Sequence, residues 1–421
     1  MKLATRLNYK GIKYLDSLKN SKKPGLNNLF KILSYLNNPQ NLLKNKVIIS
    51  GTNGKGTVAQ ILNRIYIDGG YKVGLYTSPH LLNINERIKI NDKKITFPNL
   101  NKYINIIIKV TKRIKVNLSY FELLTAVSIL YFSKAKNDIN IFEVGLGGRF
   151  DATNVIKSKI GIITNVEMDH MEYLGDTIEK ITYEKIGIIN NESTLITSVR
   201  PRSIRTIKKF CKENDTKIFR LNNDFHVESK NNQNQYISGK NKINFKTKLE
   251  GTHQLNNISV ALKTTEVIKD LYKLNVNKNQ IINSVKNVSN PGRYEVISDN
   301  PMLIIDVSHN IHSIETLIKN FQLKNPDKKV NIVLGMLKEK NPIKCINLLL
   351  KIAKKIYLTE VPNPRTFNPN KVVELLKNKR ISYISNDEIP ALLNKKDDLI
   401  LTGSIYLIGS LIKKKYVRLK K

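Results

Sequence analysis

Short apolar runs alternate with segments of helical periodicity along most of this chain. In its first half, runs of strand length cover residues 46–50, 71–76, 140–144 and 160–166. Residues 58–67 place apolar positions on one face of a helix, and Gly69 and Gly70 end that pattern. Strands that alternate with helices in this way predict a parallel sheet with helices on both faces.

The pattern changes after residue 192. Residues 192–248 contain short alternating runs and Asn/Lys-rich stretches, which predict β-hairpins that decorate the main sheet. A helix is predicted over residues 253–268. Ser, Asn, Pro and Gly cluster at residues 288–293, and alternation then resumes, with strands at 302–306, 329–334, 355–359 and 399–402 and a helix after Ile311. We therefore predict two domains, residues 1–288 and a smaller α/β domain, residues 289–421.

The composition adds a strong positive charge. Lys and Arg number 71 and Asp and Glu 34, a formal net charge of +37. Such a charge indicates either a polyanionic partner, nucleic acid above all, or the drift of an AT-rich genome toward Lys, Asn and Ile. No nucleic-acid-binding motif accompanies it, so we favour drift, with attraction of anionic substrates as a by-product.

Two further features bear on the compartment. Cys211 and Cys345 are the only cysteines, so neither a disulfide framework nor a structural zinc site is predicted. The longest apolar stretches, such as residues 405–412, are far shorter than a bilayer span, and no signal-peptide pattern opens the chain. We expect a cytoplasmic protein.

A glycine-rich loop directly after the first strand carries the clearest chemistry. It consists of Gly51, Thr52, Asn53, Gly54, Lys55, Gly56 and Thr57. Its glycines allow the backbone N–H groups to face phosphate oxygens, Lys55 would contact the β- and γ-phosphates, and the Thr57 hydroxyl would bind Mg²⁺. The alternative is a glycine turn with an incidental lysine. The strand–loop–helix context favours the phosphate loop and therefore ATP.

Two candidate ligands follow the next strands. Glu143 closes the apolar run at residues 140–144, and His170 follows the run at 160–166. Ligands bind at the carboxyl ends of strands in open α/β sheets, and carboxylate oxygens suit Mg²⁺. Taken alone, His170 is better explained as an ordinary loop histidine than as a ligand.

A specific resemblance then emerges from nine segments in a fixed order. They are residues 50–57, 77–81, 85–90, 143–154, 183–188, 251–257, 291–295, 306–310 and 401–404. In this order they resemble the folylpolyglutamate synthases and dihydrofolate synthases of the ATP-dependent Mur ligase superfamily. The segment at residues 143–154 is the most specific of them. The resemblance implies an α/β fold: an N-terminal P-loop ATPase domain with a mostly parallel sheet plus β-rich decoration, and a smaller C-terminal Rossmann-like α/β domain.

The resemblance also implies roles for individual residues. The magnesium shell would comprise Thr57, Ser78, Glu143, His170 and a carbamylated Lys185, for which the alternative is a lysine on a helix surface. Nucleotide contacts would come from the loop and from His253, Gln254, Asn257, Arg293 and Asp306. Catalytic roles would fall to Lys55, His170, Lys185, Arg293, Asp306 and His309, and acceptor binding to Pro79, His80, Leu81, Phe121, Asp151 and Asn154.

The implied reaction adds L-glutamate to dihydropteroate or to folate polyglutamates. ATP would convert the acceptor carboxylate into an acyl phosphate, with two Mg²⁺ ions, and two domains would close over the reactants to exclude water. His80 and Leu81 favour acceptance of dihydropteroate, and hence a bifunctional enzyme. The resemblance also implies a monomer. The chain departs from the family pattern at Asn28, Asn190, Val307, Ser308 and Asn341. These positions bear on amino-acid binding rather than on the reaction class.

Two rival functions remain open at this point. Another amino-acid ligase of the same superfamily would be expected to carry an extra N-terminal domain, for which the early phosphate loop leaves no room. A nucleic-acid-binding P-loop NTPase would account for the charge, and it would lose affinity steeply as salt rises.

Overall fold

The computed structural model describes residues 9–18, 25–230 and 233–419. The chain forms two compact units, Met1–Val288 and Ser289–Lys421. Each contains its own hydrophobic core, two clusters in the first unit and one in the second. The predicted α/β class, with a large, mostly parallel sheet followed by a second α/β unit, is confirmed.

The first unit is built on an eight-stranded sheet in the order β4-β3-β2-β5-β1-β6-β7-β8. Its parallel strands are β2 (Val73–Tyr76), β5 (Ile139–Glu143), β1 (Lys46–Ser50), β6 (Ile160–Ile163), β7 (Thr194–Thr197) and β8 (Lys217–Arg220). β3 (Ile88–Ile90) and β4 (Lys93–Lys94) extend one edge antiparallel. The central strands are apolar on both faces because helices cover both.

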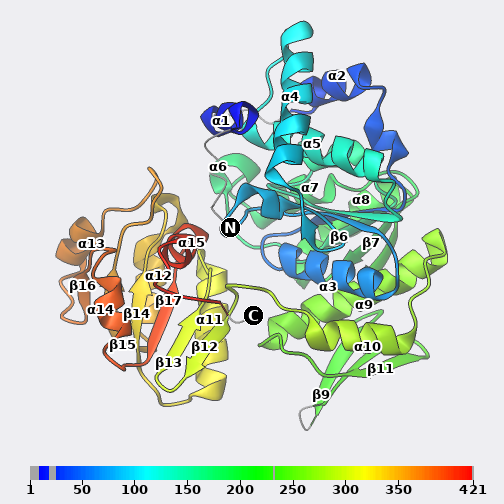
Figure 1. The fold of residues 1–421 in the computed structure, drawn as a ribbon. Helices are drawn as coiled ribbons and strands as arrows, with labels where there is room; N and C mark the ends of the chain where they lie inside the picture. The colour runs from blue at the N-terminus through cyan, green and yellow to red at the C-terminus, as the bar shows by residue number, and fades with distance from the viewer. Residues whose placement is uncertain (1–8, 19–24, 231–232, 420–421) are drawn as a thin grey trace. The chain divides into compact units, whose positions relative to one another are not determined.

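Figure 1 shows the helices of this unit on the two faces of the sheet. One face carries α1 (Lys10–Ser17), α2 (Asn27–Tyr35), α4 (Phe97–Arg113), α5 (Tyr120–Ala135), α7 (Ile178–Ile186) and α8 (Pro201–Glu213). The other carries α3 (Lys55–Asp68), α9 (Thr252–Tyr272) and α10 (Lys278–Asn287). Short helical segments are η2 (Pro39–Leu42), η3 (Ile84–Arg87), η4 (Ala152–Ile156) and α6 (Met171–Leu174).

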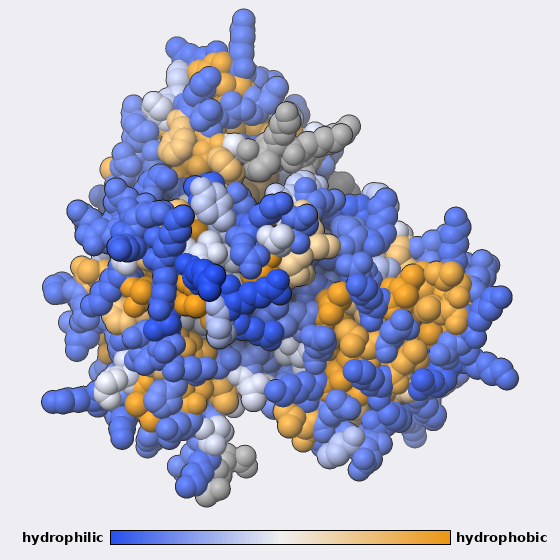
Figure 2. All heavy atoms as spheres, turned by 180° about the vertical axis from the view of Figure 1, so that it is seen from behind, coloured by the Kyte–Doolittle hydropathy of each residue, from blue (hydrophilic) through white to orange (hydrophobic). Residues whose placement is uncertain are grey.

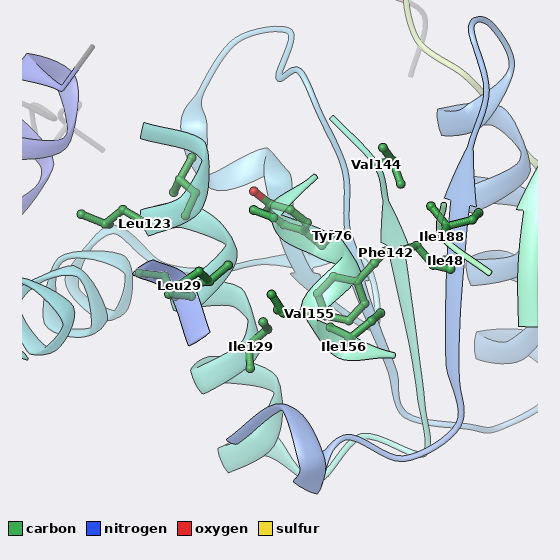
Figure 3. Close-up of a cluster of buried hydrophobic side chains, with 14 of the residues drawn as sticks. Leu29, Ile48, Tyr76, Leu123, Ile129, Phe142, Val144, Val155, Ile156 and Ile188 are labelled. Atoms are coloured by element: carbon green, nitrogen blue, oxygen red, sulfur yellow. The ribbon is translucent and has the colours of Figure 1, made fainter. Parts of the chain in front are cut away.

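Strand alternation divides the apolar side chains between these two faces. Val47 and Ile49 of β1 belong to the cluster under α3 and α9, whereas Ile48 between them belongs to the cluster under α4 and α5. In Figure 3, Phe142 of β5 lies beside Val155 of η4 and Ile129 of α5, within the cluster under α4 and α5. The sheet is therefore held between two apolar layers, which fixes the ends of its strands.

The prediction for residues 192–248 is wrong in its first half. β7 and β8 continue the main sheet as parallel strands, and α8 connects them. In the described residues of this stretch, hairpins are formed by β9 (His226–Lys230), β10 (Gln233–Ser238) and β11 (Asn241–Phe245), which make a separate three-stranded antiparallel sheet. Most side chains of α8 are charged or polar, and Ser203, Ile207 and Cys211 are its buried residues. Few apolar positions therefore marked this helix in the sequence.

The second unit contains a six-stranded sheet in the order β12-β13-β17-β14-β15-β16. β13 (Met302–Ile305), β17 (Leu399–Thr402), β14 (Val330–Leu334), β15 (Ala353–Leu358) and β16 (Ile381–Tyr383) are parallel, and β12 (Glu295–Asp299) is antiparallel. Its helical segments are α11 (Ile311–Lys324), η5 (Lys338–Lys340), α12 (Pro342–Leu349), α13 (Pro369–Leu376), α14 (Ile389–Leu393) and α15 (Ile405–Lys413). Asn310 and Ser313 start α11 with a capping box.

Hydrophilic side chains cover most of the face drawn in Figure 2, with apolar patches between them. No helix within the described ranges is both long and apolar enough to cross a bilayer.

Candidate active site

The order of the strands places three loops side by side. β1 lies between β5 and β6, so the segments that follow these three parallel strands emerge at the same edge of the sheet. The glycine-rich loop follows β1, Glu143 ends β5, and residues 164–170 follow β6. A change of direction in strand order at such a point is where open α/β sheets bind ligands.

The glycine-rich loop approaches its neighbours too closely for side chains at two positions. Gly51 has a φ of +144°, and a Cβ atom there would lie 1.9 Å from Oγ1 of Thr164. Gly54 has a φ of +87°, and its Cβ would lie 2.5 Å from Oδ1 of Asn257. Both glycines are therefore required by the packing as well as by the turn. α3 begins directly afterwards, at Lys55.

Two residues after β6 brace this loop, and neither was among the site residues predicted above. The side-chain oxygen of Asn165 accepts hydrogen bonds from the backbone N–H groups of Thr52 (3.2 Å) and Asn53 (2.8 Å). The Thr164 hydroxyl donates to the carbonyl of Asn53 at 2.6 Å. Their place immediately after the strand next to β1 is the signal that would have found them, because that strand end faces the loop.

Lys55 lies folded over the loop that precedes it. Its Nζ donates to the carbonyl oxygens of Gly51 at 2.8 Å and Thr52 at 3.2 Å. The ammonium group is thus held against the loop, and a contact with phosphate stays a prediction.

Glu143 lies against the start of α3. Its carboxylate accepts a hydrogen bond from the backbone N–H of Ser78 at 2.9 Å, and the residue is 4% exposed. A Cβ atom at Gly56 would lie 3.5 Å from Glu143 Oε1, so the carboxylate faces the loop. Thr57, the next residue, is buried. A buried carboxylate that faces the phosphate loop fits Mg²⁺, which takes few protein ligands and completes its shell with water and phosphate.

Lys185 is buried in the last turn of α7, with an exposed fraction of 4%. The alternative of a helix-surface lysine is therefore excluded. Burial lowers the pKa of the Lys185 ammonium to about 7, and the positive charge of Lys55 acts in the same direction, opposed by Asp169 and Asp151. The amine is thus within electrostatic reach of the phosphate loop and carries little charge above neutral pH.

His170 begins the short helix α6 with a φ of +52°. Its Nε2 lies 3.9 Å from Oδ2 of Asp169, and its backbone N–H donates to Oδ1 of the same carboxylate at 2.9 Å. No group of three or more His, Cys, Asp or Glu residues gathers in a metal-binding arrangement within the described part of the chain.

Asp151 and Asn154 direct their polar atoms into the protein. The Asp151 carboxylate accepts from the backbone of Gly145 (3.0 Å) and Leu146 (2.9 Å) and from both N and Oγ1 of Thr153 (3.0 and 2.6 Å). Burial raises the pKa of Asp151, and these hydrogen bonds oppose the shift. Asn154 Nδ2 donates to two backbone carbonyls. Both residues shape the loop after β5, and a contact with substrate stays a prediction.

The other residues expected to bind the acceptor also belong to the first unit. His80 Nδ1 accepts from Nε of Arg87 at 3.0 Å, so a neutral His80 carries its proton on Nε2. The Arg87 guanidinium lies 5.6 Å from the Tyr120 ring centroid. Glu86 accepts from the backbone N–H of Leu81 at 3.0 Å. Phe121 packs where a side chain on Gly145 would otherwise reach, 2.6 Å from that Cβ position.

Of the residues expected at the nucleotide base, Asn257 lies against the phosphate loop. It contacts the Gly54 position and donates from Nδ2 to Oε1 of Gln254 at 3.0 Å. Both side chains are almost fully buried, and both belong to the first two turns of α9, as does His253.

The second unit contains its own set of expected site residues. The Asp306 carboxylate, just after β13, accepts from the backbone N–H of Tyr294 at 2.7 Å and of Ser308 at 2.8 Å. Burial raises the pKa of Asp306, and Arg293 is among the groups that oppose the shift. His309 Nδ1 lies 2.9 Å from the carbonyl of Val307. Asp306 and His309 thus lie just after β13, and Arg293 lies within electrostatic reach of Asp306.

Comparison with known protein families identifies the chain. Residues 49–265 match the family described as the Mur ligase middle domain, and residues 292–405 match the Mur ligase, glutamate ligase domain. The chain belongs to the Mur ligase family, whose members named below are ATP-dependent ligases.

Three named relatives match the chain over nearly its whole length. The chain is 32% identical to the dihydrofolate synthase/folylpolyglutamate synthase of Buchnera aphidicola subsp. Acyrthosiphon pisum, over 95% of this chain and 96% of that protein. The crystal structure of a Thermotoga maritima folylpolyglutamate synthase is 31% identical, with a TM-score of 0.85 over 97% and 96% of the two chains. The structure of E. coli FolC in complex with DHPP and ADP is 26% identical, with a TM-score of 0.88 over 98% of each chain.

Proposed function

We propose that this protein is an ATP-dependent ligase that adds L-glutamate to dihydropteroate and to folate-type acceptors. The observation that carries the proposal is the meeting of three groups at one sheet edge. They are the braced phosphate loop, the Glu143 carboxylate and the buried Lys185 amine. The near-complete match to dihydrofolate synthase/folylpolyglutamate synthase relatives supports the choice of substrates.

The loop and Lys55 would act on the phosphates of ATP. A carboxylate does not condense with an amine in water, because its oxygen is a poor leaving group. Transfer of the γ-phosphoryl group to the acceptor carboxylate gives an acyl phosphate and ADP. Backbone N–H groups at the start of α3 and the Lys55 ammonium would stabilise the charge that migrates during this transfer.

The glutamate amine then attacks the acyl phosphate. A tetrahedral intermediate forms, phosphate leaves with the former acceptor oxygen, and the amine loses a proton as the amide forms. Arg293, Asp306 and His309 of the second unit are the candidates for holding nucleotide and glutamate. The position of Asp306 and His309 directly after β13 and the electrostatic effect of Arg293 on Asp306 support this assignment.

Magnesium and a carbamate belong to the same proposal. Thr57, Ser78 and Glu143 would hold Mg²⁺, which neutralises phosphate charge when it is bound. His170 and Lys185 would hold a second ion if the Lys185 amine reacts with CO₂, a step that forms an N–C bond and releases one proton. The pKa of Lys185, about 7, supports this step because only the neutral amine attacks CO₂. Monomeric state stays a prediction from the resemblance, and cytoplasmic location stays a prediction from the cysteine content and the lack of a signal or membrane-spanning pattern in the sequence.

One coupled assay tests the proposal. ADP release would be measured with glutamate plus dihydropteroate, glutamate plus tetrahydrofolate, and glutamate alone. We expect ADP only when glutamate and a pterin acceptor are both present, and product with both acceptors for a bifunctional enzyme. If no ADP is released with either acceptor, the proposal is wrong. Release that instead depends on added nucleic acid, and that falls steeply with salt, would favour the NTPase alternative suggested by the charge.

A further inference from the structure

The loop after β5 contacts the end of α7 directly through its backbone. A Cβ atom at Gly148 would lie 2.7 Å from the carbonyl oxygen of Lys185. A Cβ atom at Gly187 would lie 2.4 Å from Cβ of Arg149. Only glycine permits so close an approach at these two positions, so the two segments are packed main chain against main chain.

Three carbonyl groups at this end of α7 are covered by the same loop. The backbone N–H of Arg149 donates to Glu184 O at 2.8 Å, and its Nη2 donates to Tyr183 O at 3.3 Å. Asn154 Nδ2 donates to Gly187 O at 2.9 Å and to Arg149 O at 3.0 Å. The last carbonyls of a helix lack partners within the helix, so outside donors here determine where the helix end lies.

The Arg149 side chain adds charge and packing to these hydrogen bonds. Its guanidinium lies 4.0 Å from the ring centroid of Tyr183 and 5.7 Å from that of Phe210. Its Nε lies 4.0 Å from Oε1 of Glu184. A cation at a helix C-terminus also interacts favourably with the helix dipole. The guanidinium is therefore held on several sides at the turn that contains Lys185.

We propose that Arg149 and Asn154 are positioning residues that hold the last turn of α7, and with it the Lys185 amine, at the phosphate edge of the sheet. Neither residue acts by touching the reacting atoms. Asn154 was expected to bind the acceptor, but its donor group is used by the two carbonyls just named. The kinetic consequence rests on the proposed function, whereas the structural one does not.

The experiment compares Arg149→Gln, Asn154→Ala and a matched control, Arg202→Gln. Arg202 also pairs with α7, but at its other end: its Nε lies 3.7 Å from Oε1 of Glu179, and both side chains are exposed. Hydrogen–deuterium exchange would be followed in peptides covering residues 183–189. We expect exchange in these peptides to be about tenfold faster than in the wild type for the first two variants, because local opening becomes easier. The control should exchange at the wild-type rate.

The kinetic readout separates positioning from general damage. We expect Arg149→Gln to lower kcat by about tenfold while the KM for ATP changes less than about twofold, since a misplaced catalytic group affects the chemical step. Arg149→Lys should recover part of the loss. Unchanged exchange in both Arg149→Gln and Asn154→Ala would overturn the inference, as would a rise in KM for ATP with unchanged kcat.

The two proposals can fail separately. If the wild-type protein releases no ADP with any pterin acceptor, the proposed function is wrong, and the exchange data still decide whether the loop holds α7. If Arg149→Gln does not fold, Asn154→Ala removes a single side-chain donor and decides the same question.

Discussion

The phosphate loop and the last turn of α7 each present a lysine to the same edge of the sheet, in opposite environments. Lys55 is partly exposed and donates to two carbonyls of its own loop. Lys185 is buried, and burial lowers its pKa to about 7. A solvated ammonium keeps its charge and suits phosphate, whereas a desolvated amine loses its proton and can react. Exposure to solvent or burial thus gives the same residue type different chemistry.

Removing the charge from the phosphate loop should have the largest effect. In Lys55→Ala the backbone N–H groups remain, but the cation that would meet the migrating phosphoryl group is lost. We expect kcat/KM for ATP to fall by about a hundredfold to a thousandfold, the range for loss of one preorganised electrostatic contact. ADP release with saturating glutamate and acceptor measures it. A fall of only a few-fold would contradict the role of Lys55, and an unchanged circular dichroism spectrum would show that the variant is folded.

Replacing the buried amine should affect catalysis without weakening the fold. Lys185→Met keeps the length of the side chain and removes a group whose burial is unfavourable. We expect kcat to fall by about a hundredfold and the midpoint of thermal unfolding to stay or rise. Lys180→Met is the control, because Lys180 lies on the same helix, is 64% exposed and pairs with Asp176. Full activity in Lys185→Met would remove this residue from the site.

Loosening the brace of the phosphate loop should have an intermediate effect. Asn165→Ala leaves the N–H groups of Thr52 and Asn53 without their side-chain acceptor. Loss of such bonds corresponds to about 1–3 kcal/mol, so we expect the KM for ATP to rise by about tenfold. Asn165→Asp keeps an acceptor but places a negative charge near the phosphates, and it should bind ATP more weakly than the wild type. Titration with a non-hydrolysable ATP analogue would measure both, and equal affinity in all three proteins would exclude the brace.

A further prediction concerns the dependence of stability on pH. Because the pKa of Lys185 is lower in the folded protein than the ordinary value of 10.5, the unfolded state binds more protons between about pH 7 and pH 10.5. The free energy of unfolding of the wild type should therefore rise relative to that of Lys185→Met over this interval. Urea unfolding in CO₂-free buffer at several pH values tests the difference. A constant difference would mean that Lys185 keeps its ordinary pKa.

Much of the architecture followed from local patterns. β1, β14 and β17 were expected within one residue of their observed ends, because their apolar runs are bounded by polar or turn residues. The stretch containing β7, α8 and β8 was misread because both strands are only four residues long and α8 has few apolar positions, although these lie on one face of the helix. Pairing of β7 with β6 depends on residues distant in sequence, which local propensity does not report.

The candidate active site likewise has features that local sequence predicted and features that depend on contacts between distant residues. The sequence alone determined that a glycine-rich loop with a lysine follows a buried strand and that Glu143 ends another, because strand length, glycine and charge are local properties. Tertiary structure decided which strands are neighbours. It thereby brought Asn165 onto the loop, buried Lys185 and directed Arg149 and Asn154 to the end of α7. Burial and its pKa shift arise from neighbours far apart in the chain, so they exist only once the chain has folded.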